Sequence, residues 1–363
     1  EYITLEKRLT VDEDRDGVSD RYGTGFVNRY YYWIPWVWTA GGDVVDPAGR
    51  KATGFLDSPS TEKALQFLID LVREQKVAPD LGSWVQVEKT GAATALFSNG
   101  NLAMLVDGHW RMPELLRYIE NGTLEVGVAP LPSFPGGKKV NVMYESGWCV
   151  PVNARHPKEA FLLAAFMAGE TACRIRAEGR LEIPSVISVA EDIVRRDRTG
   201  MEQAFVEEVP FCRQPWGSII ERFSQIEWTL QDAVDEVLVN NRPMHETMKL
   251  YAGRIDKELE NIRRHELLEF KPIREHTEIL EFLVVVTVAV AAGCAILYQR
   301  ARRAGRRITA TALAFLAPSL AHLAIFVVTP NVFAAYLSLH RGDIVVTEKP
   351  FVGLGNFVEM FDD

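Results

Sequence analysis

The sequence predicts a globular α/β part followed by a transmembrane α-helical hairpin. Short apolar runs of strand character alternate with segments of helical apolar spacing up to about residue 262, which is typical of the α/β class. Two long apolar runs follow at 279–298 and 308–339, and the second has no Asp, Glu, Lys or Arg. About 20 apolar residues in a helix cross the hydrocarbon core of a bilayer, so each run is long enough to span it.

The connector between the two apolar runs predicts which side of the membrane each part occupies. It carries five arginines and no acidic residue, and short loops of this kind stay on the cytoplasmic side. Residues 1–278 and 340–363 are then extracytoplasmic. The predicted organisation is a globular domain at 1–268, a linker at 269–278, a transmembrane helix at 279–298, a cytoplasmic Arg-rich turn at 299–307, a second transmembrane helix at 308–339 and the start of an outer loop at 340–363. The alternative is a pair of buried core helices in a soluble protein.

Composition narrows the possible functions. The net charge of −9 and the lack of a basic stripe argue against a nucleic-acid partner. The Arg-rich turn has at most a weak attraction for anionic membrane lipid. GxxxxGK[ST], GxSxG and HExxH are all absent from the sequence, so it predicts neither ATP hydrolysis nor these hydrolase sites. Cys149, Cys173 and Cys212 have no metal-binding spacing, and their disulfide state stays open.

An acidic loop near the start of the chain predicts a calcium site. Asp12, Asp14, Asp16 and Asp20 follow the spacing of calcium loops, in which alternate oxygens converge on one cation while Gly17 permits the turn. The acidic residue expected at the twelfth loop position is missing, because Gly23 stands there. The alternative is a solvated turn rich in Asp.

Residues 26–40 form the densest aromatic stretch and predict a helix that lines a binding cleft. Tyr31 and Trp33 belong to it, and aromatic rings with polar tips suit both sugar rings and an ordinary core. Residues three and four apart share one helix face, so part of the stretch is expected to face the ligand and part to pack inward.

A short apolar run at 102–106 predicts a buried strand that delivers Asp107, His109 and Trp110 at its carboxyl end. In open α/β sheets ligands bind at that edge. Further strands are predicted at 126–131 and 140–152, and the second presents Tyr144, Glu145, Ser146 and Trp148.

The order of motifs over residues 1–262 resembles the family 1, maltose-type solute-binding proteins of bacterial ABC sugar importers. The motifs that carry this resemblance are DxDxDGxxDxYG at 12–23, the aromatic helix ending in AGG at 42, DSP…ALQFLIDLV at 57–72, FSNGNLAM…GHW at 97–110, VGVAPLPSFPGG at 126–137 and ESGWCVPVNARHPKEAFLLAAFMA at 145–168.

The resemblance implies a type II periplasmic-binding-protein-like fold, with two α/β lobes that close on a sugar. The chain begins well inside such a protein, so we expect an incomplete N-terminal lobe and weak sugar binding by this chain alone. The sugar-stacking tryptophan of the family matches Trp110, and an early-helix aromatic matches Tyr31. The further expected binding residues are Trp33, Trp148 and Trp216 as aromatic contacts and Asp107 and Glu145 as acceptors for sugar hydroxyls. His109 departs from the family, which usually has a small residue or Pro there.

A second resemblance covers FLAPSLAHLAIFVVTPNVFAAYLSL at 315–339 and FVGLGNFVEMF at 351–361, which are similar to the first span and first outer loop of an ABC sugar permease. It implies a binding-protein–permease fusion in the bacterial plasma (inner) membrane. The implied partners are a carbohydrate, a second permease subunit and cytoplasmic ATPase subunits.

The expected function is therefore carbohydrate capture for import, without an enzymatic reaction on this chain. Two alternatives stay open. A membrane-tethered glycoside hydrolase would need two carboxylates across one bond, and Asp107 with Glu145 is the pair available. A sensor ectodomain with a membrane anchor is the other, although the permease-like tail argues against it.

Overall fold

The structure is a computed structural model that describes residues 1–266, 329–340 and 351–362, with isolated positions at 293, 296, 299, 300, 303, 312 and 327. The chain divides into two compact units, Glu1–Arg263 and Arg264–Asp363, and each is described by itself. The predicted linker, the first predicted span, the Arg-rich turn and most of the second predicted span lie outside the described residues. Among the described residues, no helix is both long and apolar enough to cross a bilayer.

The first unit is mostly helical. Its early helices are α1 (Tyr2–Leu9), α2 (Tyr30–Thr39), α3 (Pro59–Arg73), α4 (Trp84–Thr90), α5 (Ala92–Ser98), the 3-10 turn η1 (His109–Arg111) and α6 (Met112–Glu120). The later ones are α7 (Pro157–Ala168), α8 (Glu170–Glu178), α9 (Ile187–Arg196), α10 (Met201–Glu208), η2 (Val209–Phe211), η3 (Trp216–Ser218), α11 (Phe223–Leu238) and α12 (Met244–Glu266). Apolar residues recur at helical spacing in the sequence at 64–72, 158–168, 219–239 and 244–262, which predicts a helix at each place. The structure confirms these helices as α3, α7, α11 and α12, with shifts of a few residues at their ends.

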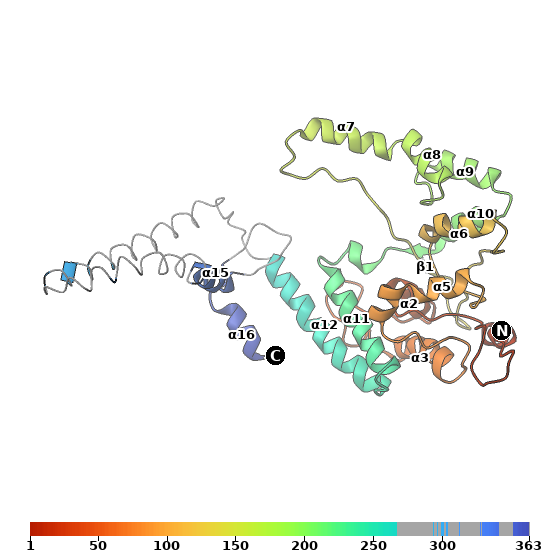
Figure 1. The fold of residues 1–363 in the computed structure, drawn as a ribbon, viewed down its shortest axis with the longest axis horizontal. Helices are drawn as coiled ribbons and strands as arrows, with labels where there is room; N and C mark the ends of the chain where they lie inside the picture. Colours follow the sequence, from red (N-terminus) through yellow and green to blue (C-terminus); the bar gives the residue numbers. More distant parts are fainter. Residues whose placement is uncertain are drawn as a thin grey trace. The chain divides into compact units, whose positions relative to one another are not determined.

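The main core lies around α2, which packs with α3 and α11 (Figure 1). Tyr30 and all residues from Trp33 to Thr39 of α2 are buried, so most of the helix is surrounded by the core. Only Tyr31 and Tyr32, in its first turn, are partly exposed. α3 begins at Ser58, whose Oγ accepts a hydrogen bond from the Thr61 N–H (3.3 Å), as the sequence predicts for a helix start.

The predicted strands at 102–106, 126–131 and 140–152 are largely wrong. Within the described residues, Leu102 makes one parallel bridge to Tyr22, and the only strands are β1 (Asn141–Val142) and β2 (Cys212–Arg213), which pair in parallel. An extended segment becomes a strand only where a neighbouring backbone receives its hydrogen bonds. Because the segment at 102–106 has only Tyr22 beside it for such bonds, the apolar run does not extend into a ladder.

In the second unit, α15 (Thr329–Ser338) and α16 (Gly355–Asp362) are described. The Asn356 amide donates to the carbonyl oxygens of Ser338 (2.8 Å) and His340 (2.9 Å). These bonds satisfy carbonyl groups at the end of α15 and join the two helices locally.

Candidate functional site

Three aromatic side chains from distant segments meet in the first unit. The Tyr31 ring on α2 lies with its centroid 5.9 Å from that of Trp110 on η1 and 5.9 Å from that of Tyr144, at angles of 90° and 82°. Trp110 is 48% exposed and Tyr144 is 42% exposed. We call Tyr31, Trp110 and Tyr144 the aromatic cluster. Its edge-to-face packing fixes the rings while large apolar surfaces stay open to solvent.

A charged group lies directly beside the aromatic cluster. The Tyr32 hydroxyl donates to Asp107 Oδ1 (3.1 Å), and Arg111 Nε donates to Asp107 Oδ2 (2.8 Å). Arg111 Nη1 also donates to Glu114 Oε2 (2.7 Å). Burial, and next the Asp107 carboxylate, raise the pKa of Tyr32, so its hydroxyl stays neutral and able to donate. Asp107 therefore orders both Tyr32 and Arg111 at the edge of the cluster.

The structure brings together three of the residues predicted from the sequence, namely Tyr31, Trp110 and Asp107. The sequence predicts that Asp107 accepts hydrogen bonds from sugar hydroxyls. In the structure both of its carboxylate oxygens already accept hydrogen bonds from the protein, so a sugar hydroxyl would compete with Tyr32 and Arg111 for them. One of them accepts a further bond from the Gly108 N–H (2.8 Å).

Two predicted binding residues lie in the core instead. Trp33 is fully buried, and its indole N–H donates to Asn28 Oδ1 (3.2 Å). Trp216 is also buried, and its indole N–H donates to Asp43 Oδ1 (2.8 Å). A tryptophan packed in a core is buried and has a hydrogen-bond partner for its indole N–H. Trp33 and Trp216 meet both conditions, so they are core residues in this structure.

Trp148 and Glu145 lie on the surface. Trp148 is exposed, and the Arg176 guanidinium lies over its ring at 5.9 Å from the centroid. Glu145 is exposed next to Tyr144 in the sequence. In the part of the chain that the structure describes, the Trp148 ring makes no ring contact with the aromatic cluster.

The structure adds Tyr144, Tyr32 and Arg111 to the site. Burial, and next the charges of Glu227 and Tyr31, raise the pKa of Tyr144, so this phenol also stays neutral. A weak sequence signal existed for Arg111, which stands four residues after Asp107 and pairs with it. No sequence signal distinguishes Tyr144 from its exposed neighbours.

The predicted calcium loop folds as a compact acidic turn. Carboxylate oxygens of Asp12, Asp14 and Asp20 lie within 4.8 Å of one another. The Asp16 carboxylate is outside this group and accepts the Val18 N–H (2.8 Å). Three convergent carboxylates fit the oxygen chemistry of a hard cation, but they also hold the turn by accepting backbone N–H groups, such as Gly17 N–H to Asp12 (3.1 Å). The calcium site stays a prediction.

The chain is similar in sequence to bacterial solute-binding proteins. Residues 2–172 match the family model of the bacterial extracellular solute-binding proteins. A probable ABC transporter-binding protein from Deinococcus radiodurans is 28% identical over 156 residues, which is 42% of this chain and 34% of that relative. The chain therefore spans about a third of that relative's length.

Solved structures share the fold. The maltose/maltodextrin-binding domain from Bdellovibrio bacteriovorus, bound to maltotriose, matches with a TM-score of 0.58 at 20% identity, over 70% of this chain and 65% of that one. An ABC substrate-binding protein from Listeria monocytogenes, in complex with cycloalternan, matches with a TM-score of 0.58 at 19% identity, over 71% and 63%. Maltose-bound MalE3 from T. maritima matches with a TM-score of 0.55 at 21% identity, over 72% and 64%. The chain thus has the fold of maltose-type solute-binding proteins, and its residues 2–172 match the bacterial extracellular solute-binding protein family.

Proposed function

We propose that this chain binds a carbohydrate outside the cytoplasm and delivers it to an ABC importer. The observation that carries the proposal is the aromatic cluster, whose Trp110 and Tyr144 rings remain nearly half exposed although they pack on Tyr31. The family match over residues 2–172 and the fold shared with sugar-bound proteins support it.

The chemistry of the cluster suits a sugar. The apolar C–H face of a pyranose packs on an indole or phenol ring, while its hydroxyls need donors and acceptors at the ring edges. Tyr144 brings a phenol to the cluster, and the Arg111–Asp107 pair lies at its edge. Arg111 is neutralised by two carboxylates, Asp107 and Glu114. An uncharged ligand therefore fits this edge better than a phosphate, which would need an arginine free to pair with it.

Lobe closure is part of the proposal. The chain leaves the α2 core through β1 and returns through β2, which are adjacent strands, and the intervening residues 143–211 also contact η1 through the His109–Glu202 hydrogen bond. Such a pair of strands is able to act as a hinge. Tyr144 lies just beyond it and contacts Tyr31 of the core. A sugar that contacts both the α2 core and residues 143–211 binds the closed arrangement more tightly than the open one, and it therefore shifts the equilibrium toward closure.

The membrane part of the proposal rests on the sequence. The apolar runs at 279–298 and 308–339 form a hairpin that tethers the binding domain, and the tail from 340 begins the outer loop of a permease. The domain is then extracytoplasmic at the bacterial plasma membrane. A second permease subunit and separate ATPase subunits complete the importer, because the chain has no P-loop.

A carbohydrate panel tests the proposal. The full chain is screened by thermal shift and tryptophan fluorescence against neutral mono- and oligosaccharides, with glycerol phosphate as an anionic comparison, up to millimolar concentrations. We expect a saturable response to a neutral sugar and no chemical change in it. No response from a folded chain to any sugar would contradict the proposal, and release of product from a glycoside would identify a hydrolase.

A further inference from the structure

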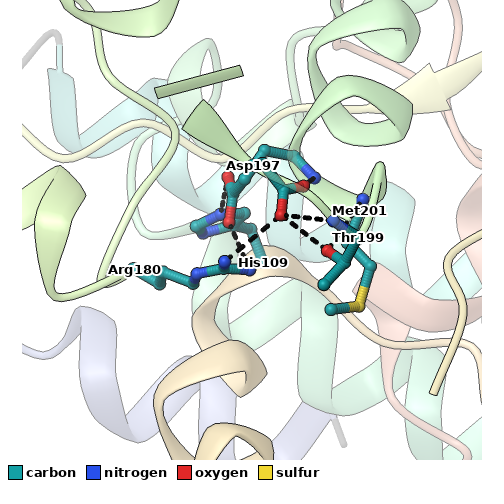
Figure 2. Close-up of polar contacts among 6 residues, drawn as sticks. His109, Arg180, Asp197, Thr199 and Met201 are labelled. Atoms are coloured by element: carbon teal, nitrogen blue, oxygen red, sulfur yellow. Dashed lines mark hydrogen bonds and ion pairs between the residues drawn. The ribbon is translucent and has the colours of Figure 1, made fainter. Parts of the chain in front are cut away.

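A buried charged network includes His109, the residue directly before Trp110 in the sequence (Figure 2). His109 Nε2 donates to Glu202 Oε2 (2.9 Å), across 93 residues of sequence. His109 is 6% exposed and Glu202 is 3% exposed. The pair therefore joins η1 to α10 out of contact with water.

The Glu202 carboxylate is held from its other side as well. Arg180 Nη1 lies 3.3 Å from Glu202 Oε1, and Arg180 Nη2 lies 3.3 Å from Asp197 Oδ1. Asp197 Oδ2 accepts the backbone N–H of Glu202 (2.9 Å), and Thr199 donates to Oδ1 through both its N–H (3.0 Å) and its hydroxyl (2.6 Å). Although burial opposes it, these bonds lower the pKa of Asp197 and keep the carboxylate charged. Figure 2 shows Arg180 and Thr199 beside the Asp197 carboxylate.

A second contact ties His109 to the same helix. The Phe205 ring on α10 meets the imidazole edge-on, with centroids 4.9 Å apart and an angle of 77°. Charge-assisted bonds in a buried setting are short and directional, and losing one partner leaves an uncompensated charge. The hydrogen bond to Glu202 and the packing of the Phe205 ring therefore fix the position of the His109 imidazole.

His109 is the first residue of η1, and the next two residues are Trp110 and Arg111 of the binding site. The Trp110 ring lies against the backbone of Gly108, where a Cβ atom would come within 2.1 Å of Cζ3. A displacement of His109 would thus move the backbone on which the exposed indole is seated. Neither His109 nor Glu202 belongs to the aromatic cluster, so their effect on a ligand passes through Trp110 and its neighbours.

We propose that His109 and Glu202 are positioning residues that set the place and tilt of the Trp110 ring for ligand stacking. The inference rests on the proposed function for its effect on sugar binding, but the effect on the Trp110 ring is independent of any ligand. The Arg180–Asp197 pair fixes the carboxylate, and the carboxylate fixes the imidazole.

The chain offers a matched control. His245 and Glu62 form a second histidine–glutamate pair (Nδ1 to Oε1, 2.7 Å), but His245 is exposed and belongs to α12. We compare His109→Ala, His109→Gln and His245→Ala in the full chain labelled with 5-fluorotryptophan, and Trp110→Phe assigns the Trp110 fluorine resonance. His109→Ala should shift or broaden that resonance. His109→Gln, which keeps an N–H donor for Glu202, and His245→Ala should leave it unchanged.

Sugar titration completes the test. For the sugar that the carbohydrate panel selects, we expect His109→Ala to weaken binding about tenfold, a coupling of about 1.4 kcal/mol. In a Trp110→Ala background the same change should have no further effect, because His109 acts through Trp110. An equal loss in both backgrounds would mean a general structural role and would overturn the proposal, as would an unmoved Trp110 resonance.

A fold control keeps the result interpretable. If His109→Ala does not fold, Glu202→Ala removes the acceptor for the imidazole, and the same resonance is read. An unmoved resonance in folded Glu202→Ala then contradicts the proposal. If no sugar binds the wild-type chain, the proposed function fails, while the fluorine resonance still decides whether His109 positions Trp110.

Discussion

At Gly108 the backbone lies close against the exposed Trp110 indole. Atoms of that ring lie 2.1–2.3 Å from where a Cβ would stand, and distances this short force a shift. The backbone of Gly108 itself is extended, so a side chain there meets no backbone strain. Steric contact with Trp110 is thus the reason why glycine suits this position.

Gly108→Ala should push the Trp110 ring away from Tyr31 and weaken sugar binding about tenfold or more, with a small loss of stability. Gly127 is the matched control, because a Cβ there meets nothing within 4 Å and its φ is not positive. Sugar titration and near-UV circular dichroism of Gly108→Ala and Gly127→Ala provide the measurement. Equal binding by the two variants would contradict the close packing of Trp110 on Gly108.

Glu6 is a buried carboxyl group that makes folding depend on pH. Burial raises its pKa to about 7. Because the unfolded chain has the ordinary value near 4.5, the folded state binds the extra proton between these two values. Its contribution to stability is therefore full below about pH 4.5 and is lost as pH rises to about 7.

Glu6→Gln should remove this dependence and be more stable than the wild type by about 2 kcal/mol at pH 8, with a much smaller difference at pH 5. Urea unfolding at the two pH values measures the difference, with Glu13→Gln, at an exposed position, as the control. A difference between wild type and Glu6→Gln that is the same at both pH values would show that Glu6 does not titrate on folding.

At the residue scale, the aromatic helix and the GHW turn mark Tyr31, Trp110 and Asp107 in the sequence, and the structure brings these three residues together. Their contact with a sugar stays a prediction. Trp33 was misassigned because it lies two positions from Tyr31, about 200° around the helix, and sequence alone does not say which stripe faces inward. Trp216 was misassigned because an Asp43 bond, distant in sequence, buries its indole.

At the scale of elements, the start of α2 is anchored by a polar group buried against α11. The Asn28 amide donates to the Gln231 carbonyl (2.7 Å) and to Asp235 Oδ1 (2.7 Å), and it accepts the Trp33 indole N–H. Gln231 Oε1 accepts the Tyr30 N–H (3.2 Å), one of the amides that a helix start leaves without an internal partner. Because Asn28 and Gln231 are both buried, losing one leaves its partners without water to replace it.

Asn28→Ala should therefore destabilise the fold by about 2–3 kcal/mol. Asn240→Ala should cost less than about 0.5 kcal/mol, because Asn240 is exposed and its side-chain amide donates to Glu236 on the helix surface, four residues back. Urea unfolding of both variants measures the contrast. If Asn28→Ala unfolds at the same urea concentration as Asn240→Ala, the α2 anchor contributes nothing.

Helices were predictable and strands were not, for a physical reason. A helix such as α3 or α12 is specified by local spacing and caps, since its hydrogen bonds lie within the segment. A strand needs a partner from elsewhere in the chain, and the apolar run at 102–106 finds only Tyr22 among the described residues. Strand-like composition alone thus predicted sheet pairing wrongly.

At the scale of the whole molecule, the aromatic cluster joins three segments that are far apart in sequence. Tyr31 comes from α2, Trp110 from η1, and Tyr144 follows β1, which pairs with β2 at the proposed hinge. The order of family-like motifs predicted the fold that the solved structures share. It did not predict the His109–Glu202 link, because that link depends on residues 93 apart whose proximity only the folded chain creates.

The central claim is that Trp110 is a sugar-stacking residue of an ABC-type binding protein. The most direct measurement is a calorimetric titration of the full chain, Trp110→Ala and Trp228→Ala with the neutral sugar that the panel selects. Trp228 is the matched control, because it is 54% exposed on α11 and makes no ring contact with the aromatic cluster in the described chain. We predict saturable binding by the wild type and Trp228→Ala, and a loss of at least about tenfold in Trp110→Ala. Equal affinity of Trp110→Ala and the wild type would contradict the claim.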